Sequence, residues 1–212
     1  VHTFDSSETV EIAKIIENGY RLVNISFINE IAKFADEFNA DVWDAINAAS
    51  TKPMGYQPFY PGPGAGGHCI PVDPRFLLWQ ANNIGSELSV LESAVETNES
   101  MPLFVTDRIE ATLADAGIDI ADAVILALGI TYKPDIADVR HSPAREVCTQ
   151  LVERGADVRV VDPVAEDPSL GRAAFARDLT PKAVAAGDLV AVLVDHSAFD
   201  MDQVARDASL VF

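Results

Sequence analysis

A single cysteine lies at the end of a loop rich in glycine and proline, in the run PGPGAGGHCIPVDP from Pro61 to Pro74. The glycines carry no side chain, so a ligand can approach the backbone closely, and the prolines keep the loop stiff. Cys69 therefore stands where a nucleophile is useful, and the neighbouring His68 favours the reactive thiolate form. We interpret this segment as an active-site loop.

Two other interpretations of Cys69 stay open. A lone cysteine in an intracellular protein is most often a small buried hydrophobe. The chain also contains His68, His141 and Cys148, which are metal-ligand types, but no C-x-x-C or H-x-x-x-H pair supports a metal site. We prefer a nucleophile to a ligand and expect no metal.

Three further polar residues have types that suit carbonyl chemistry. Lys14 and Asn18 are four residues apart, so on a helix they project from one face and offer a cation and an amide donor. Such pairs are usually exposed surface residues without a functional role. Asp73 follows Cys69 by four residues and can position water or take a proton, although it can equally be the N-cap of the next helix.

A basic pair lies in the loop after a predicted strand. Lys133 and Arg140 can meet phosphates there, and the alternative is an exposed salt bridge to Asp135 or Asp138. The G-x-G-x-G-G of residues 62–67 is not a dinucleotide-binding fingerprint, because it follows no strand.

The elements that position these residues change character along the chain. Helical spacing of apolar residues predicts one long helix, or two in series, over about residues 8–38. Further helices are predicted over about 41–49, 73–82 and 87–116, with Pro102 expected to kink or interrupt the last. Short apolar runs over 123–128, 158–161 and 189–194, with helices near 143–154 and 180–186, predict a parallel sheet. Because ligands bind beyond the carboxyl ends of such strands, the loop 129–143 lies at the functional edge.

The predicted fold class is therefore α/β, with an all-helical domain over residues 1–101 joined by a long helix to a Rossmann-like parallel α/β domain over 102–212. Fifteen basic and 33 acidic residues among 212 give a net charge of −18, which opposes binding to nucleic acid or an anionic membrane. Two distant cysteines and no signal peptide or long apolar run predict a cytoplasmic protein. Since the chain begins at Val1 without Met, we expect it to be a piece of a longer protein.

Three motifs carry a resemblance to a known family. ENGYRLVNISFINE (17–30), TKPMGYQPFYPGPGAGGHCIPVDP (51–74) and ITYKPDIADVRHSPA (130–144) resemble the UDP-glucose/GDP-mannose dehydrogenase family. Within it, the second motif is most similar to enzymes acting on UDP-N-acetylglucosamine, and Val72 stands where UDP-glucose enzymes more often carry lysine. Family members have an N-terminal NAD domain, a central helical dimerisation domain and a C-terminal UDP-binding domain, and this chain resembles the last two.

The resemblance also implies roles for individual residues. Cys69 corresponds to the nucleophile, which forms a thiohemiacetal and then a thioester, while Lys14 and Asn18 stabilise the oxyanion and orient water, and Asp73 assists proton transfer. The sugar and nucleotide contacts correspond to Phe59, Tyr60, Pro61, Gly62 and Gly66, the substrate-phosphate contact to Lys133, and an NAD contact to Arg140. Met54 departs from an arginine that many relatives place nearby to reach a neighbouring subunit.

The expected function is a cytoplasmic NAD-dependent nucleotide-sugar 6-dehydrogenase of polysaccharide biosynthesis, here without its NAD domain. It would oxidise the C6 alcohol of a UDP-hexosamine, by resemblance UDP-N-acetylglucosamine, to a uronate in two steps, as a homodimer through the central helices. A rival hypothesis is a non-catalytic module that binds UDP-sugar and dimerises. A cysteine acyl-transfer enzyme is a weaker rival, because no His and Asn pattern completes a triad.

Overall fold

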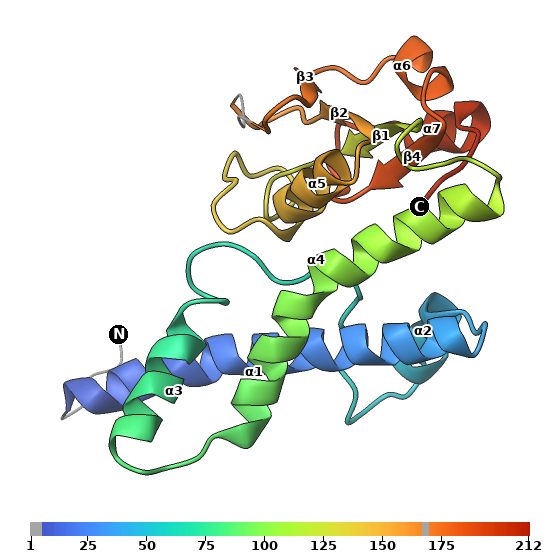
Figure 1. The fold of residues 1–212 in the computed structure, drawn as a ribbon. Coiled ribbons are helices and arrows are strands. Elements are labelled where there is room, and N and C mark those ends of the chain that lie inside the picture. The colour runs from blue at the N-terminus through green and yellow to red at the C-terminus, as the bar shows by residue number, and fades with distance from the viewer. Residues whose placement is uncertain (1–5, 167–169) are drawn as a thin grey trace. The chain divides into compact units, whose positions relative to one another are not determined.

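The protein divides into two compact units, Val1–Ser100 and Met101–Phe212. The structure is a computed structural model and describes residues 6–166 and 170–212 (Figure 1). The first unit is helical and the second contains a parallel sheet, as the sequence predicts. Within the described residues, no helix combines the length and the apolar character that crossing a membrane requires.

The first unit is built from helices whose starts follow capping chemistry. They are α1 (Ser7–Glu37), α2 (Val42–Ser50), α3 (Asp73–Asn83) and the first part of α4 (Ser89–Asp115). The Ser6 side chain accepts a hydrogen bond from the Thr9 amide at the start of α1, and Asp41 caps α2 in the same way. The predicted helices are confirmed to within a few residues.

Two local expectations need correction. Asp73 is not the N-cap of α3: Val72 holds that position without a side-chain hydrogen bond, and the Asp73 carboxylate accepts one from Asn18 of α1 instead. The Asn18 amide is fully buried, so it needs a hydrogen-bond acceptor, and the Asp73 carboxylate supplies one. Helix α4 is also continuous through Pro102, so of the two expected effects of this proline, a kink or an interruption, the interruption does not occur. One missing backbone donor does not break it, because Met101 and Val105 beside the proline are buried.

The second unit contains a four-stranded parallel sheet in the order β3-β2-β1-β4. Its strands are β1 (Val124–Leu128), β2 (Asp157–Val161), β3 (Ala174–Ala176) and β4 (Leu189–Val192). The helices α5 (Pro143–Glu153) and α6 (Pro181–Ala185) were predicted, whereas β3 and α7 (Met201–Asp207) were not.

Helices cover both faces of this sheet. On one face, residues of α4 and α5 such as Ile109 and Cys148 share a core with Ile125 of β1. On the other face, residues of α6 and α7 form a second core with the side chains of β1 and β4 that point to that face. The strands are therefore buried from both sides, which explains their continuous apolar runs.

The strand order reverses at β1, which lies between β2 and β4. Gly129 directly follows β1 with φ +79°, and a Cβ at this position would lie 2.5 Å from both the Cβ and the carbonyl oxygen of Val194. Only glycine allows the ends of β1 and β4 to approach so closely. The crevice beyond a reversal of this kind is where open α/β sheets bind ligands.

Candidate functional site

The first group of candidate residues lies on the glycine loop of the helical unit. The Gly62 amide donates to Oδ1 of Asn29 at 2.9 Å, and the Ala65 amide donates to Oδ1 of Asn98 at 2.6 Å. Nδ2 of Asn98 donates back to the Ala65 carbonyl at 3.1 Å. Both asparagines are buried, so α1 and α4 fix the loop from within this unit without any ligand. Neither asparagine was identified from the sequence.

The two cysteines have opposite environments. Cys69 is exposed, and its carbonyl accepts a hydrogen bond from the Asp73 amide at 2.9 Å, which places both residues on one turn at the start of α3. Cys148 is buried on α5, and this burial raises the pKa of its thiol to about 12. The exposed sulfur is therefore the one available to a ligand.

The structure brings Asn18 and Asp73 together directly. Nδ2 of Asn18 donates to Oδ2 of Asp73 at 2.6 Å, and Oδ1 of Asn18 accepts from Nη2 of Arg21 at 2.6 Å. Because a guanidinium only donates and a carboxylate only accepts, these two contacts fix which way the amide points. Asn18 is fully buried, so its donor faces Asp73 one turn after Cys69.

Lys14 is linked to this pair only through other residues. Its ammonium contacts Oε2 of Glu17 at 2.9 Å, and Oε1 of Glu17 accepts from Arg21 at 3.1 Å. The hydrogen bond from Lys14 is the main reason why the pKa of Glu17 lies below its usual value. Glu17 and Arg21 were not identified from the sequence, although they follow Lys14 by three and seven residues on the same helix face.

Aromatic contacts support the segment that precedes the glycine loop. Tyr60 stacks on Trp43 of α2 with ring centroids 5.8 Å apart, and Phe59 meets the ring of Tyr20 edge-on at 5.9 Å. Tyr60 remains largely exposed, whereas Gly66 is buried. The five residues proposed as sugar and nucleotide contacts therefore all lie within one anchored segment, residues 59–66.

In the second unit, the two predicted basic residues differ: Arg140 forms a salt bridge and Lys133 does not pair with the described acidic residues of its loop. The Arg140 guanidinium donates to the Asp138 carboxylate through Nε and Nη2 at 2.7 to 3.1 Å, as in the salt-bridge alternative. The hydrogen bonds from Arg140 lower the pKa of Asp138 to about 2. Lys133 is exposed, and no ion pair joins it to Asp135 or Asp138, both of which the structure describes.

A buried carboxylate organises the loops at the carboxyl edge of the sheet, and it was missed from the sequence. Asp162 directly follows β2 and accepts four backbone hydrogen bonds, at 2.8 Å from Ile130, 3.2 Å from Thr131, 3.0 Å from Val164 and 2.8 Å from Ala165. Burial alone would raise the pKa of Asp162, but these backbone donors outweigh it and lower the pKa below its usual value. Asp162 is thus an anion inside the unit.

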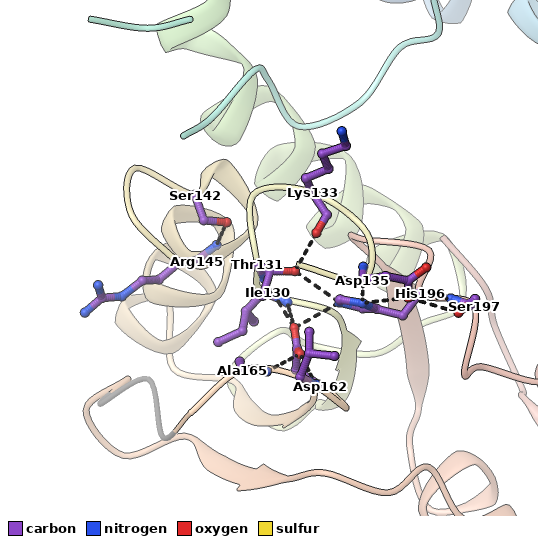
Figure 2. Close-up of polar contacts among 11 residues, drawn as sticks. Ile130, Thr131, Lys133, Asp135, Ser142, Arg145, Asp162, Ala165, His196 and Ser197 are labelled. Carbon is purple, nitrogen blue, oxygen red and sulfur yellow. Dashed lines mark hydrogen bonds and ion pairs between the residues drawn. The ribbon is translucent and has the colours of Figure 1, made fainter. Parts of the chain in front are cut away.

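His196, fully buried after β4, completes this network (Figure 2). Nδ1 of His196 accepts from the Asp135 amide at 3.0 Å, so this nitrogen carries no proton. The proton is therefore on Nε2, which lies 3.1 Å from both Oδ2 of Asp162 and Oγ1 of Thr131. Since the Thr131 hydroxyl donates to the Lys133 carbonyl at 3.1 Å, it accepts from His196.

No group of three or more His, Cys, Asp or Glu side chains among residues 6–166 and 170–212 is placed to hold a metal ion. Likewise, none of the strands in these ranges is followed by a G-x-G-x-x-G turn, the usual cradle of a dinucleotide.

Two domains of one protein family match the chain. The central domain of the UDP-glucose/GDP-mannose dehydrogenase family matches residues 8–100, and the UDP binding domain of the same family matches residues 126–211. Among curated proteins, the UDP-N-acetyl-D-mannosamine dehydrogenase of Methanocaldococcus jannaschii is 36% identical over 208 residues, covering 97% of this chain and 45% of that protein. The Escherichia coli K12 protein of the same name is 34% identical over 200 residues, covering 92% and 47%.

Solved structures give the same picture. A UDP-D-ManNAc dehydrogenase from Pyrococcus horikoshii superposes with a TM-score of 0.80 at 30% identity, covering 96% of this chain and 47% of that one. The Staphylococcus aureus UDP-N-acetyl-mannosamine dehydrogenase Cap5O superposes with a TM-score of 0.74, also at 30% identity, covering 97% and 45%. The chain spans about half the length of each of these relatives.

Proposed function

Because this chain belongs to the UDP-glucose/GDP-mannose dehydrogenase family, we propose that it is the part of an NAD-dependent UDP-sugar dehydrogenase that binds the substrate and acts on its C6 carbon. The observation that carries this proposal is the hydrogen bond from the Asn18 amide to the Asp73 carboxylate. The orientation of this amide is fixed, and Asp73 lies one helical turn after the exposed Cys69. A nucleophile, an amide donor and a carboxylate are what a covalent oxidation of an aldehyde to an acid needs.

The chemistry proposed for these residues starts with the C6 aldehyde. The Cys69 thiolate adds to the carbonyl carbon, and the electron pair moves to the carbonyl oxygen. Lys14 and the N–H of Asn18 that does not bond to Asp73 stabilise that oxygen. At the thioester stage, water attacks the same carbon, its proton passes to Asp73, and the Cys69 sulfur leaves as thiolate. The product is the uronate.

NAD, when bound, accepts the hydrides of the two oxidations. The described residues of this chain do not fit a complete NAD site, because no strand leads into a dinucleotide cradle and the Arg140 guanidinium already pairs with Asp138. We assign to this chain at most an edge contact with NAD through Arg140, and place no step of the reaction on it.

The substrate we propose is a UDP-N-acetylhexosamine. The sequence motifs favoured UDP-N-acetylglucosamine, but the relatives described above act by name on the mannosamine epimer. UDP-N-acetyl-D-mannosamine is therefore the better supported epimer for this chain. Lys133 is the proposed contact to its diphosphate, since the ammonium is exposed at the edge of the sheet where the strand order reverses.

We also propose that the helical unit forms a homodimer. Helix α1 exposes large apolar side chains, among them Ile16 at 66%, Phe27 at 58% and Phe34 at 56%. A groove of about 190 Å³ lies along the N-terminal half of α1, lined by Ile12, Ile15, Ile16, Gly19, Tyr20, Leu77 and Leu91. An apolar surface of this kind on a chain of net charge −18 indicates a protein interface.

Calorimetry of this chain with UDP-N-acetylmannosamine, UDP-N-acetylglucosamine and UDP-glucose tests the binding part of the proposal. We expect the mannosamine nucleotide to bind most tightly, and Lys133→Ala to weaken all three similarly. Turnover is tested in the protein that carries the NAD domain, by following NADH formation. There Cys69→Ser should abolish uronate formation while leaving the affinity for the UDP-sugar within about threefold. Tight binding without turnover in that longer protein would favour the non-catalytic binding module instead.

A further inference from the structure

We propose that His196 is a positioning residue, which holds the loop carrying Lys133 in the conformation that receives a nucleoside diphosphate. This inference rests on the proposed function, in which Lys133 meets the diphosphate. It assigns separate roles to the two ring nitrogens. Nε2 stabilises the fold through its contact with Asp162, and Nδ1 holds the conformation of the Lys133 loop through the Asp135 amide.

The position of His196 in the fold gives the first argument. The imidazole comes from the connection after β4, and the Lys133 loop comes from the connection after β1 (Figure 2). These two connections flank the place where the strand order reverses. A contact between them therefore lies at the edge where a sheet of this type binds ligands.

Lys133 is held through its neighbours on both sides. Its own carbonyl accepts from the Thr131 hydroxyl, which in turn accepts from Nε2 of His196. Two residues later, the Asp135 amide donates to Nδ1 of the same ring. Because the Thr131 hydroxyl can donate to Lys133 without His196, the direct tether between the ring and this loop is the hydrogen bond from the Asp135 amide to Nδ1, while the Lys133 ammonium stays exposed.

Backbone strain gives a second, independent argument. Asp135 has a φ of +60°, in the left-handed region that non-glycine residues rarely adopt. Such a residue persists only where its surroundings hold it, and residues of this kind gather at ligand sites. Here Nδ1 of His196 holds the Asp135 amide, and the Ser197 amide and hydroxyl donate to its carboxylate at 3.1 and 3.0 Å.

Two substitutions separate the two tasks. His196→Asn places an oxygen near the position of Nδ1, so it keeps an acceptor for the Asp135 amide and loses the donor to Asp162. His196→Gln places an amide nitrogen near the position of Nε2, so it keeps the donor to Asp162 and loses the acceptor for Asp135. If His196 were merely structural, each substitution would change stability and UDP affinity together. If it is a positioning residue, one substitution lowers mainly the stability and the other mainly the affinity.

The experiment measures three quantities on this chain: the free energy of unfolding, hydrogen exchange of the Asp135 amide, and the Kd for UDP. We expect His196→Gln to speed exchange of that amide at least about tenfold and to raise the Kd about five- to tenfold, the equivalent of one lost hydrogen bond. His196→Asn should lower stability more, yet keep the amide protected and the Kd within about twofold. Ser197→Ala is the matched control, because it removes a contact to the Asp135 side chain but leaves the main-chain tether.

A double-mutant cycle then asks whether His196 acts through Lys133. If it does, His196→Gln raises the Kd far less in a Lys133→Ala background than in the wild type. Additive effects, or an equal loss of affinity in the Asn and Gln variants, would overturn the inference. So would an Asp135 amide that remains protected in His196→Gln. If wild-type chain does not bind UDP, the proposed function of this unit and the ligand assignment both fail, and the exchange pattern alone decides whether the tether exists.

Discussion

The buried thiol of Cys148 should react more slowly than a cysteine in water by more than about three orders of magnitude, and this difference follows from its pKa. A thiol with a pKa of about 12 is ionised to about one part in 10⁴ at pH 8, which describes Cys148. A free cysteine in water, with a pKa near 8.5, is about one quarter thiolate at the same pH. Burial reduces the reactivity of Cys148 further, because the reagent must wait for the core around α5 to open.

The assay is alkylation of the folded chain with iodoacetamide at pH 8, followed by mass spectrometry of the two cysteine peptides. We expect complete modification of Cys69 before Cys148 is detectably labelled. Cys69→Ser should take up no label over that period, whereas the wild-type chain in urea should be labelled at both positions at similar rates. Comparable rates in the folded chain, or earlier labelling of Cys148, would refute both the burial argument and the choice of Cys69 as nucleophile.

The same pKa predicts how stability depends on alkaline pH. Above about pH 8.5 the unfolded chain loses the Cys148 proton, while the folded chain keeps it until the pH approaches about 12. The unfolded state then binds fewer protons, so the free energy of unfolding falls by up to about 1.4 kcal/mol per pH unit. Urea titrations at pH 8, 9 and 10 should show a flatter dependence for Cys148→Ala than for the wild type.

Three further predictions concern other parts of the molecule. Gly129→Ala should lower the free energy of unfolding about 1–3 kcal/mol more than Gly117→Ala, because both have φ +79° but only the first places a Cβ against Val194; equal losses in urea titrations would contradict this. Arg140→Gln should raise the pKa of Asp138 from about 2 towards its ordinary 3.8, measured by NMR, and an unchanged pKa would show that Arg140 is not the cause. Light scattering should report a dimer of this chain, which alone should have no dehydrogenase activity and weak NAD affinity, and a monomer at high concentration would reject the interface on α1.

The strands were predictable where their burial is continuous. The runs that form β1, β2 and β4 are apolar along their whole length because helices cover both faces of the sheet. Strand β3 has only three residues, none of them buried, and α7 buries only Val204, so neither carries a periodic signal.

Candidate residues that lie close together in the sequence were predictable, whereas residues whose partners are far away in the sequence were not. Cys69 and Asp73 lie within one turn and were identified together. His196 was missed because its partner Thr131 lies 65 residues earlier. A signal did exist: Asp162 and His196 are polar residues placed shortly after apolar runs, which in a parallel sheet means the carboxyl edge. That rule was applied only to the connection after the first strand.

The distance of 65 residues between Thr131 and His196 also has a consequence for biosynthesis. At about 5–20 residues per second, a ribosome adds His196 about 3–13 s after Thr131. Before His196 is added, Asp162 and its four backbone donors have all been synthesised, the farthest of them, Ile130, 32 residues earlier than Asp162, whereas the acceptor for the Asp135 amide has not. The loop of Lys133 is therefore synthesised well before the side chain that tethers it, and it can reach its final conformation only after β4 and the connection that follows β4 have been added.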